Sequence, residues 1–150
     1  MILPDFKDFP RKGRLLGIDW GAKRTGVAVS DDSQEFFFVR EPIVSLKKSQ
    51  SVARQIADTA IAEKVVGIVF GLPTYSDGKN SSTAKLVRDC AIETSEYVNL
   101  PIVFIDETLT SFSAQESMGK IRLSDIKEKL DSESARVILE NAVAVLNRLK

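Results

Sequence analysis

Acidic residues stand at the ends of apolar runs that are typical of buried β-strands. Asp19 closes the run LLGID, and Asp106 and Glu107 directly follow the apolar run 102–105. The carboxyl ends of parallel strands open onto the crevice where ligands bind, so acids from distant parts of the chain can meet there. A third candidate is Asp131, at the start of a predicted helix with an apolar stripe. The sequence therefore predicts a group of carboxylates at one edge of a sheet.

Clustered carboxylates favour metal-assisted chemistry on phosphate esters. They repel one another, and their pKa values rise unless a cation neutralises them. Mg²⁺ suits such a group because it binds through a few carboxylates together with substrate phosphate oxygens. Two such ions about 4 Å apart can activate a water and stabilise the leaving oxygen in phosphodiester cleavage. The chain contains no histidine, which excludes Ser-His-Asp and Cys-His catalysis, a histidine zinc site and an imidazole base.

Each of these acids also has a purely structural explanation. Asp19 could cap a hairpin turn, and Asp106 and Glu107 could be solvated acids that close a strand. Asp131 could be the N-cap of its helix, because Asp is favoured there and its charge suits the helix dipole. An N-cap residue can also bind a metal, so these two roles of Asp131 are compatible.

Basic and hydroxyl side chains near these acids are candidates for contacts with phosphate. Lys23 and Arg24 lie in the predicted loop directly after Asp19, and Arg and Lys side chains and helix N-termini bind phosphate oxygens. The further candidates lie near a predicted helix start or after the second acidic pair: Lys79, Lys85, Arg88, Thr110 and Ser111. Helical lysines are often only solvated, and the hydroxyls could cap a helix. Basic and acidic residues both number 21, so a nucleic-acid surface must be a local patch.

The spacing of apolar residues predicts three leading strands, followed by alternating helices and strands. The predicted elements are strands at 15–20, 26–30 and 35–44, a helix at 49–63, a strand at 65–70, a helix at 81–98, a strand at 102–105, and helices at 111–118 and 131–149. Ser49 or Ser51 can cap the first helix, and Pro42 marks an end or an edge position of the third strand. This order predicts an α/β domain of ribonuclease H-like arrangement, with a five-stranded mixed sheet and helices on both faces.

Length and composition predict a single soluble domain. The chain has 150 residues, of which 43% are hydrophobic and 28% are charged, as in globular proteins. Residues 1–13 are predicted to be an N-terminal extension, and the polar segment 119–130 is predicted to be a mobile loop. No apolar run approaches the roughly 20 residues that span a bilayer, and the first residues do not resemble a secretory signal. A cytoplasmic location is therefore expected.

Four segments of the chain resemble the YqgF (RuvX) family of ribonuclease H-like nucleases. The segments are GIDWGAKRTGVAVSD, GIVFGLPTYSDGKNSSTAKLVRD, LPIVFIDETLTSFSAQ and DSESARVILE, in the order that the family has them. Its members are described both as Holliday junction resolvases and as pre-16S rRNA nucleases. The resemblance implies a ribonuclease H-like fold and a Mg²⁺- or Mn²⁺-dependent nuclease that matures the 5′ end of 16S rRNA in the cytoplasm. It also implies acidic site positions at Asp19, Glu107 and Asp131, and a basic position at Arg24.

Two positions depart from the pattern of that family. Arg usually follows the strand-end Asp-Glu pair, whereas this chain has Thr108, which removes one expected phosphate contact. The last motif usually reads D-x-x-A-A, whereas here Ser134 precedes Ala135. Serine is still small, so close packing of this helix should survive.

The leading hypothesis is an endonuclease for structured RNA in which Asp19, Glu107 and Asp131 hold Mg²⁺ or Mn²⁺. One alternative is a resolvase of branched DNA, which needs two active sites and hence a symmetric dimer. Another is a nucleic-acid-binding module of ribosome assembly without catalysis. Actin-like ATPases also have an Asp followed by glycines in their first hairpin, but they need two lobes, and this chain supplies one. The expected partners are precursor rRNA or branched DNA and ribosomal particles, with no membrane, for a monomer or a homodimer.

Overall fold

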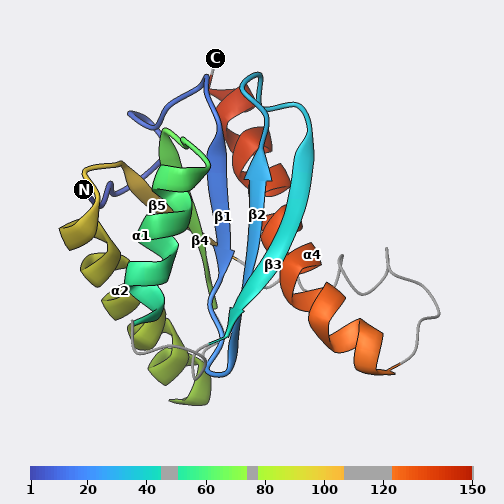
Figure 1. Cartoon of the computed structure of the whole chain (residues 1–150). Helices are drawn as coiled ribbons and strands as arrows, with labels where there is room; N and C mark the ends of the chain where they lie inside the picture. The colour runs from blue at the N-terminus through green and yellow to red at the C-terminus, as the bar shows by residue number, and fades with distance from the viewer. Residues whose placement is uncertain (45–50, 74–77, 107–122, 150) are drawn as a thin grey trace.

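A five-stranded mixed sheet forms the centre of the structure, a computed structural model that describes residues 1–44, 51–73, 78–106 and 123–149. The strands lie in the order β3-β2-β1-β4-β5, and helices cover both faces of the sheet (Figure 1). Their bounds are β1 (Leu15–Asp19), β2 (Arg24–Ser30), β3 (Phe37–Val44), β4 (Gly67–Leu72) and β5 (Ile102–Asp106). The sheet and its strand sequence confirm the predicted α/β architecture.

The pairing of the strands decides which ends meet. β1, β2 and β3 form an antiparallel meander, whereas β1 pairs with β4, and β4 with β5, in parallel. Ile18 is in register with Phe70, and Phe70 with Phe104. The carboxyl ends of β1, β4 and β5 therefore lie at the same end of the sheet. β3 is an outermost strand, which confirms the edge position predicted from Pro42.

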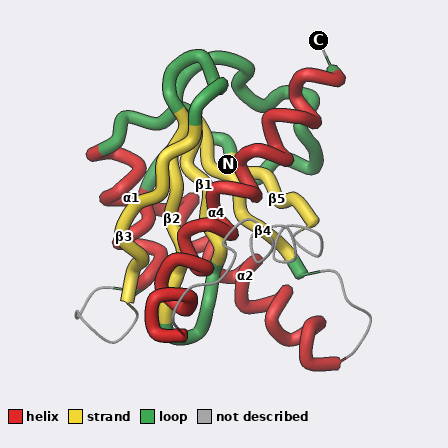
Figure 2. Tube along the Cα trace, turned by 90° about the vertical axis from the view of Figure 1, so that its right-hand side faces the viewer, coloured by secondary structure: helices red, strands yellow, loops and turns green. Residues whose placement is uncertain are grey.

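Within the described residues, three helices pack on the two faces of the sheet, and Figure 2 shows the sheet as a continuous twisted layer. They are α1 (Val52–Ala62), α2 (Gly78–Tyr97) and α4 (Leu123–Arg148). Side chains alternate between the faces along each strand. Leu16 and Ile18 belong to the cluster under α1 and α2, and Leu15 belongs to the cluster under α4. Within the described residues, no helix is both long enough and apolar enough to cross a membrane.

Helix α1 shows how local sequence sets the ends of an element. Ser51 Oγ accepts a hydrogen bond from the Arg54 amide at 3.1 Å, which satisfies one of the free donors at the helix start. Ser51, and not Ser49, is therefore the N-cap of the predicted pair. After the helix, Lys64 adopts a φ of 57°, a left-handed conformation that is common where a helix ends. The chain then turns into β4.

The last helix begins earlier than the sequence pattern predicts. It starts at Leu123, so the prediction of a start at Asp131 is wrong, and residues 123–130 are helical instead of part of a mobile loop. Asp131 lies inside the helix, which overturns its assignment as the N-cap. The segment 123–130 is rich in Lys, Glu and Leu, which favour a helix even where their pattern is polar. The predicted helix at 111–118 lies outside the described residues.

The N-terminal segment pairs with β5 and places two aromatic side chains in the core. Ile2 forms a parallel bridge with Ile102, and the Leu3 amide donates to the Ile102 carbonyl at 2.8 Å. Phe6 and Phe9 are 8% and 3% exposed and pack edge to face in the cluster under α4. The sequence predicts residues 1–13 to be an N-terminal extension. In the structure, Phe6 and Phe9 of this segment are buried, whereas Met1 and Ile2 are exposed.

Asp31 fixes the turn between β2 and β3, and this contact makes stability depend on pH. Its carboxylate accepts hydrogen bonds from the Phe36 and Glu35 amides at 3.0 and 2.9 Å and from Ser33 Oγ at 2.6 Å. Bonds to the charged form, led by that from Phe36, lower the pKa of Asp31 to about 2 from the ordinary value of 3.8. A lowered folded pKa means that the stabilisation is complete above the unfolded value and is lost as pH falls towards the folded one.

We therefore expect the free energy of unfolding of Asp31→Asn to fall below that of the wild type at pH 6. The difference should shrink progressively as pH is lowered from about 5 towards about 2. Urea denaturation of both proteins at several pH values measures it. Asp32→Asn is the control because it makes the same chemical change at the adjacent exposed residue. A difference between wild type and Asp31→Asn that is the same at pH 6 and pH 2.5 would contradict this account.

Candidate active site

Asp19 is the last paired residue of β1 and lies opposite Gly26 of β2. It thus belongs to the strand and not to the turn. Gly17 and Leu15, two and four positions before Asp19 in the same strand, lie against the α4 side of the sheet. Side chains two positions apart share a face, so the half-buried Asp19 also lies on the α4 face. The carboxylate is presented at the edge where the parallel strands end.

The end of β5 reaches the same edge. Asp106 is in register with Leu72, the last residue of β4. Since β1 and β5 are the two neighbours of β4, their backbones lie two strand spacings apart, about 10 Å. Glu107 follows directly but lies outside the described residues, so its place in the candidate site stays a prediction.

Helix α4 runs antiparallel to β1, as its contacts show. Arg11 Nη1 donates to the carbonyl of Leu149 at 3.3 Å, whereas Gly17 lies against Ala135 and Leu139. Position 131 is one helical turn before Ala135, and therefore its backbone lies farther towards the carboxyl end of β1. Asp19 lies in that direction from Gly17. The backbone of α4 thus brings Asp131 to the end of the sheet that holds Asp19.

Of the three acids predicted to form the site, which are Asp19, Glu107 and Asp131, only Asp19 has a described side chain. Among the side chains that the structure describes, no group of three potential metal ligands comes together. The structure establishes the arrangement of the elements. β1, β5 and α4 approach the same end of the sheet, and Asp19, Asp106 and Asp131 are the acidic positions that they carry there.

The hairpin after Asp19 folds back tightly. A Cβ on Gly21 would lie 2.2 Å from the carbonyl oxygen of Arg24, so only glycine fits this close approach. Trp20 packs against the cluster under α1 and α2 and anchors the loop on the sheet. Lys23 is exposed and Arg24 is half-buried at the first position of β2. Lys23 in the turn and Arg24 at the start of β2 therefore flank the end of β1 that carries Asp19.

The other basic candidates lie along α2, which begins at the same end of the sheet (Figure 1). Lys79 is in its first turn. Lys85 and Arg88 are about 9 and 14 Å farther along the helix axis than Lys79. Both are exposed, and Lys85 Nζ lies 3.9 Å from Asp89 Oδ2. Lys85 and Arg88 therefore lie farther than Lys79 from the end of the sheet that carries Asp19. Thr110 and Ser111 lie outside the described residues.

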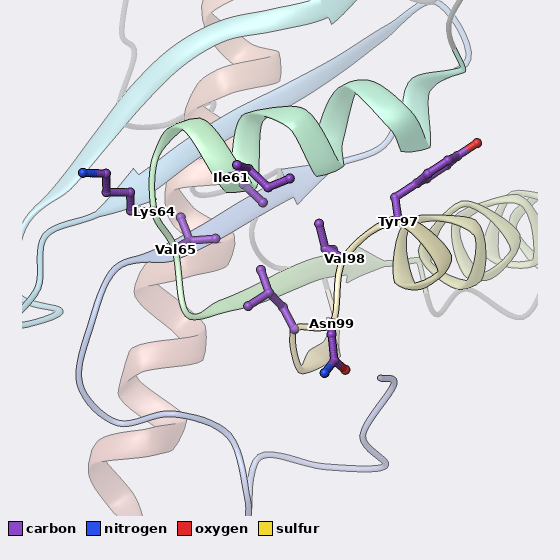
Figure 3. Close-up of a pocket in the computed structure, with 8 residues that line it drawn as sticks. Ile61, Lys64, Val65, Tyr97, Val98 and Asn99 are labelled. Atoms are coloured by element: carbon purple, nitrogen blue, oxygen red, sulfur yellow. The ribbon is translucent and has the colours of Figure 1, made fainter.

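A cavity of about 350 Å³ lies at the other end of the sheet. It is lined by Val65 and Leu100, which precede β4 and β5, and by Ile61, Tyr97 and other residues at the ends of α1 and α2 (Figure 3). The candidate active site is therefore distinct from this cavity and is formed by the open edge of the sheet.

One residue that matters for the site was missed from the sequence. Gly17 lies in the middle of β1, directly beneath α4, and no side chain fits between them. The available signal was an isolated glycine within an apolar strand, which often marks a close approach of another backbone. Ala135 is 0% and Ser134 3% exposed, so the expected close packing survives the substitution of serine for the usual alanine.

Curated relatives resemble nearly the whole chain. A protein of Maridesulfovibrio salexigens is 36% identical over 133 residues, which cover 87% of this chain and 98% of the relative. A protein of Rhodobacter capsulatus is 33% identical over 158 aligned residues, with 99% and 97% covered. Both carry the name "Putative pre-16S rRNA nuclease".

Solved structures share the fold at low sequence identity. RuvC of T. thermophilus, in complex with a Holliday junction substrate, has a TM-score of 0.56 at 9% identity and covers 90% of this chain and 96% of its own. The yeast mitochondrial Holliday junction resolvase Ydc2 also has a TM-score of 0.56, at 13% identity, with 94% and 81% covered. These likenesses confirm the predicted ribonuclease H-like fold.

The family comparison agrees with the relatives and with the fold. The model described as "RuvX: Holliday junction resolvase" matches residues 13–144. This range includes all five strands, the helices α1 and α2 and most of α4. The chain therefore belongs to the RuvX family.

Proposed function

We propose that this protein is a Mg²⁺- or Mn²⁺-dependent endonuclease that hydrolyses phosphodiester bonds of structured RNA in the 5′-end maturation of pre-16S rRNA. The names of its relatives support the substrate. The observation that carries the chemistry is the convergence of β1, β5 and α4 at one end of the sheet, with acidic residues in each. This function would be exercised in the cytoplasm on precursor rRNA, free or within ribosomal particles, by a monomer or a homodimer.

The residues present fit a hard divalent cation. Asp19, Glu107 and Asp131 would hold it, and all three offer the oxygen ligands that Mg²⁺ and Mn²⁺ accept. When bound, the cation supplies activation of water and neutralisation of charge on the leaving oxygen. Asp19 is the fixed member because β1 is paired on both sides, with β2 and β4. Its half-buried position limits its movement and its contact with bulk water.

Basic groups beside this edge would bind and orient the substrate. Lys23 and Arg24 stand on the loop after Asp19, where they can neutralise phosphates next to the scissile bond. Lys79, in the first turn of α2, lies where a helix N-terminus also favours anions. Lys85 and Arg88 lie farther along α2 and would contact phosphates more distant from that bond. Thr110 and Ser111 would donate hydrogen bonds to the backbone of the substrate.

The same chemistry on branched DNA is the second candidate. The description of the matching family model and the fold shared with resolvases favour it. A resolvase must cut two strands and therefore needs two active sites in one dimer. A monomeric state in solution, measured by light scattering at working concentration, would therefore count against the resolvase, whereas a dimer is compatible with both candidates.

One experiment tests both substrates. The purified protein is incubated with Mg²⁺ or Mn²⁺ and either a 16S precursor RNA or a four-way DNA junction, with chelated samples as controls. We expect metal-dependent cleavage of the RNA near the 5′ boundary of mature 16S rRNA. Cleavage confined to the junction would support the resolvase instead. A folded protein that binds RNA and cuts neither substrate would overturn the nuclease proposal and favour a non-catalytic assembly factor.

A further inference from the structure

The contact between β1 and α4 is made at Gly17. A Cβ built on Gly17 would lie 2.6 Å from Leu139 Cγ and 2.8 Å from the carbonyl oxygen of Ala135. Both distances are shorter than real Cβ contacts, and the second involves backbone that a rotamer change cannot move. Gly17, Ala135 and Leu139 are buried, the last two at 0% exposure. The helix therefore approaches the strand as closely as the missing side chain permits.

On both β1 and α4, this contact lies a few residues from the acidic position of the proposed site. Asp19 is two residues after Gly17 on the same face of β1, about 7 Å along the strand. Asp131 is four residues before Ala135, about 6 Å along the helix axis. Because α4 runs antiparallel to β1, these two steps lead towards the same end of the sheet. The depth at which α4 rests on Gly17 thus sets the distance between the two acidic positions.

We propose that Gly17 is a positioning residue for metal binding: its lack of a side chain lets α4 pack closely enough for Asp131 and Asp19 to share a cation. The inference rests on the proposed function, since it assigns a purpose to the spacing of its carboxylates. Alanine at this position would force α4 away from β1 by several tenths of an ångström. A metal site tolerates such displacement poorly because its ligands must be held within about 0.5 Å of the productive geometry.

Gly67 provides a matched control. It lies on β4, in register with Leu15, and a Cβ there would lie 2.7 Å from Cζ and 2.9 Å from Cε1 of Phe9. This overlap is similar in size but involves the far end of a side chain in the N-terminal segment. It is also near the opposite end of the sheet from Asp19. Gly67→Ala should therefore disturb packing without moving α4 at the candidate site.

The experiment compares Mn²⁺ binding by wild type, Gly17→Ala and Gly67→Ala, measured as loss of the free Mn²⁺ electron paramagnetic resonance signal without substrate. Thermal unfolding of each protein without metal measures the structural cost. We expect both variants to unfold at lower temperature. Gly17→Ala should bind Mn²⁺ at least about tenfold more weakly, the lower end of the loss when support of a metal ligand is removed, and Gly67→Ala should bind it like wild type.

A second pair of variants covers the case in which Gly17→Ala does not fold. Leu139→Ala removes the side-chain part of the overlap, and Gly17→Ala in that background leaves only the contact with the Ala135 carbonyl. The double variant should bind Mn²⁺ more weakly than Leu139→Ala alone. If the double variant and Leu139→Ala bound Mn²⁺ with equal affinity, the positioning role would be overturned. Equal affinity of wild type and a folded Gly17→Ala would overturn it as well. Neither result would affect the proposed function. Wild type that binds no Mn²⁺ would instead overturn the metal site of the proposed function, and the positioning role with it.

Discussion

Replacing Asp19 by Asn is expected to lower the rate of RNA cleavage by at least about 100-fold while the protein remains folded. Asparagine keeps the size of the side chain but loses the charge that would bind the cation. Removal of a group that only hydrogen-bonds a metal ligand already lowers metal affinity or activity about 10- to 100-fold. Removal of a direct ligand should lower the cleavage rate more. Single-turnover cleavage at saturating Mn²⁺ measures this loss, and circular dichroism with thermal unfolding tests the fold.

Asp32→Asn is the matched control for this variant. It makes the same change at an exposed aspartate in the turn after β2, near Gly13, whose amide donates to the Asp32 carbonyl at 2.7 Å. That turn lies at the end of the sheet opposite Asp19. The control should cleave like wild type. If folded Asp19→Asn also cleaved like wild type, the carboxylate mechanism would lose its fixed member and the proposal would fail.

Glu107→Gln is expected to impair cleavage as severely as Asp19→Asn, whereas Asp106→Asn should retain most of the activity. The reason is the alternation along β5. Ile102 and Phe104 pack with the cluster under α1 and α2, while positions 103 and 105 pack with the cluster under α4. Continuation of this series assigns position 107 to the α4 face, which is the face of Asp19, and position 106 to the other.

The two adjacent acids act as controls for each other, because each variant removes one negative charge from the same strand end. Cleavage rates and the Mn²⁺ concentration that gives half-maximal rate should be measured for both, together with their unfolding temperatures. A larger loss in Asp106→Asn than in Glu107→Gln would contradict the alternation argument and assign the ligand to Asp106.

The strands and their order were predictable because apolar, β-branched runs identify buried strands. The boundaries shifted by a few residues, as at β4, which begins at Gly67 and not at residue 65. The first eight residues of α4 were missed because five of them are polar, although Leu123, Ile126 and Leu130 stand at helical spacing. The role of Phe6 and Phe9 was also hidden, since isolated aromatics carry no periodicity and their partners are distant in the sequence.

The candidate site was predictable to the level of its residue types and strand ends. A chain without histidine leaves carboxylates as its main candidates for metal-assisted hydrolysis, and Asp19 and the pair Asp106-Glu107 end apolar runs. The sequence could not show how deeply α4 packs, because this depends on the contact between Gly17 and a backbone carbonyl more than a hundred positions later.

The bridge between Ile2 and Ile102 has a consequence for the order of folding. The hairpin of β1 and β2 closes a short loop, whereas this bridge joins residues about a hundred positions apart and must pay a larger entropy of loop closure. The segment that contains Ile2 is therefore expected to dock late, after β5 has joined the sheet. Until then the outer edge of β5 offers unpaired amides and carbonyls to other chains, a known route to aggregation. Once docked, the N-terminal segment pairs with the beginning of that edge, at Ile102.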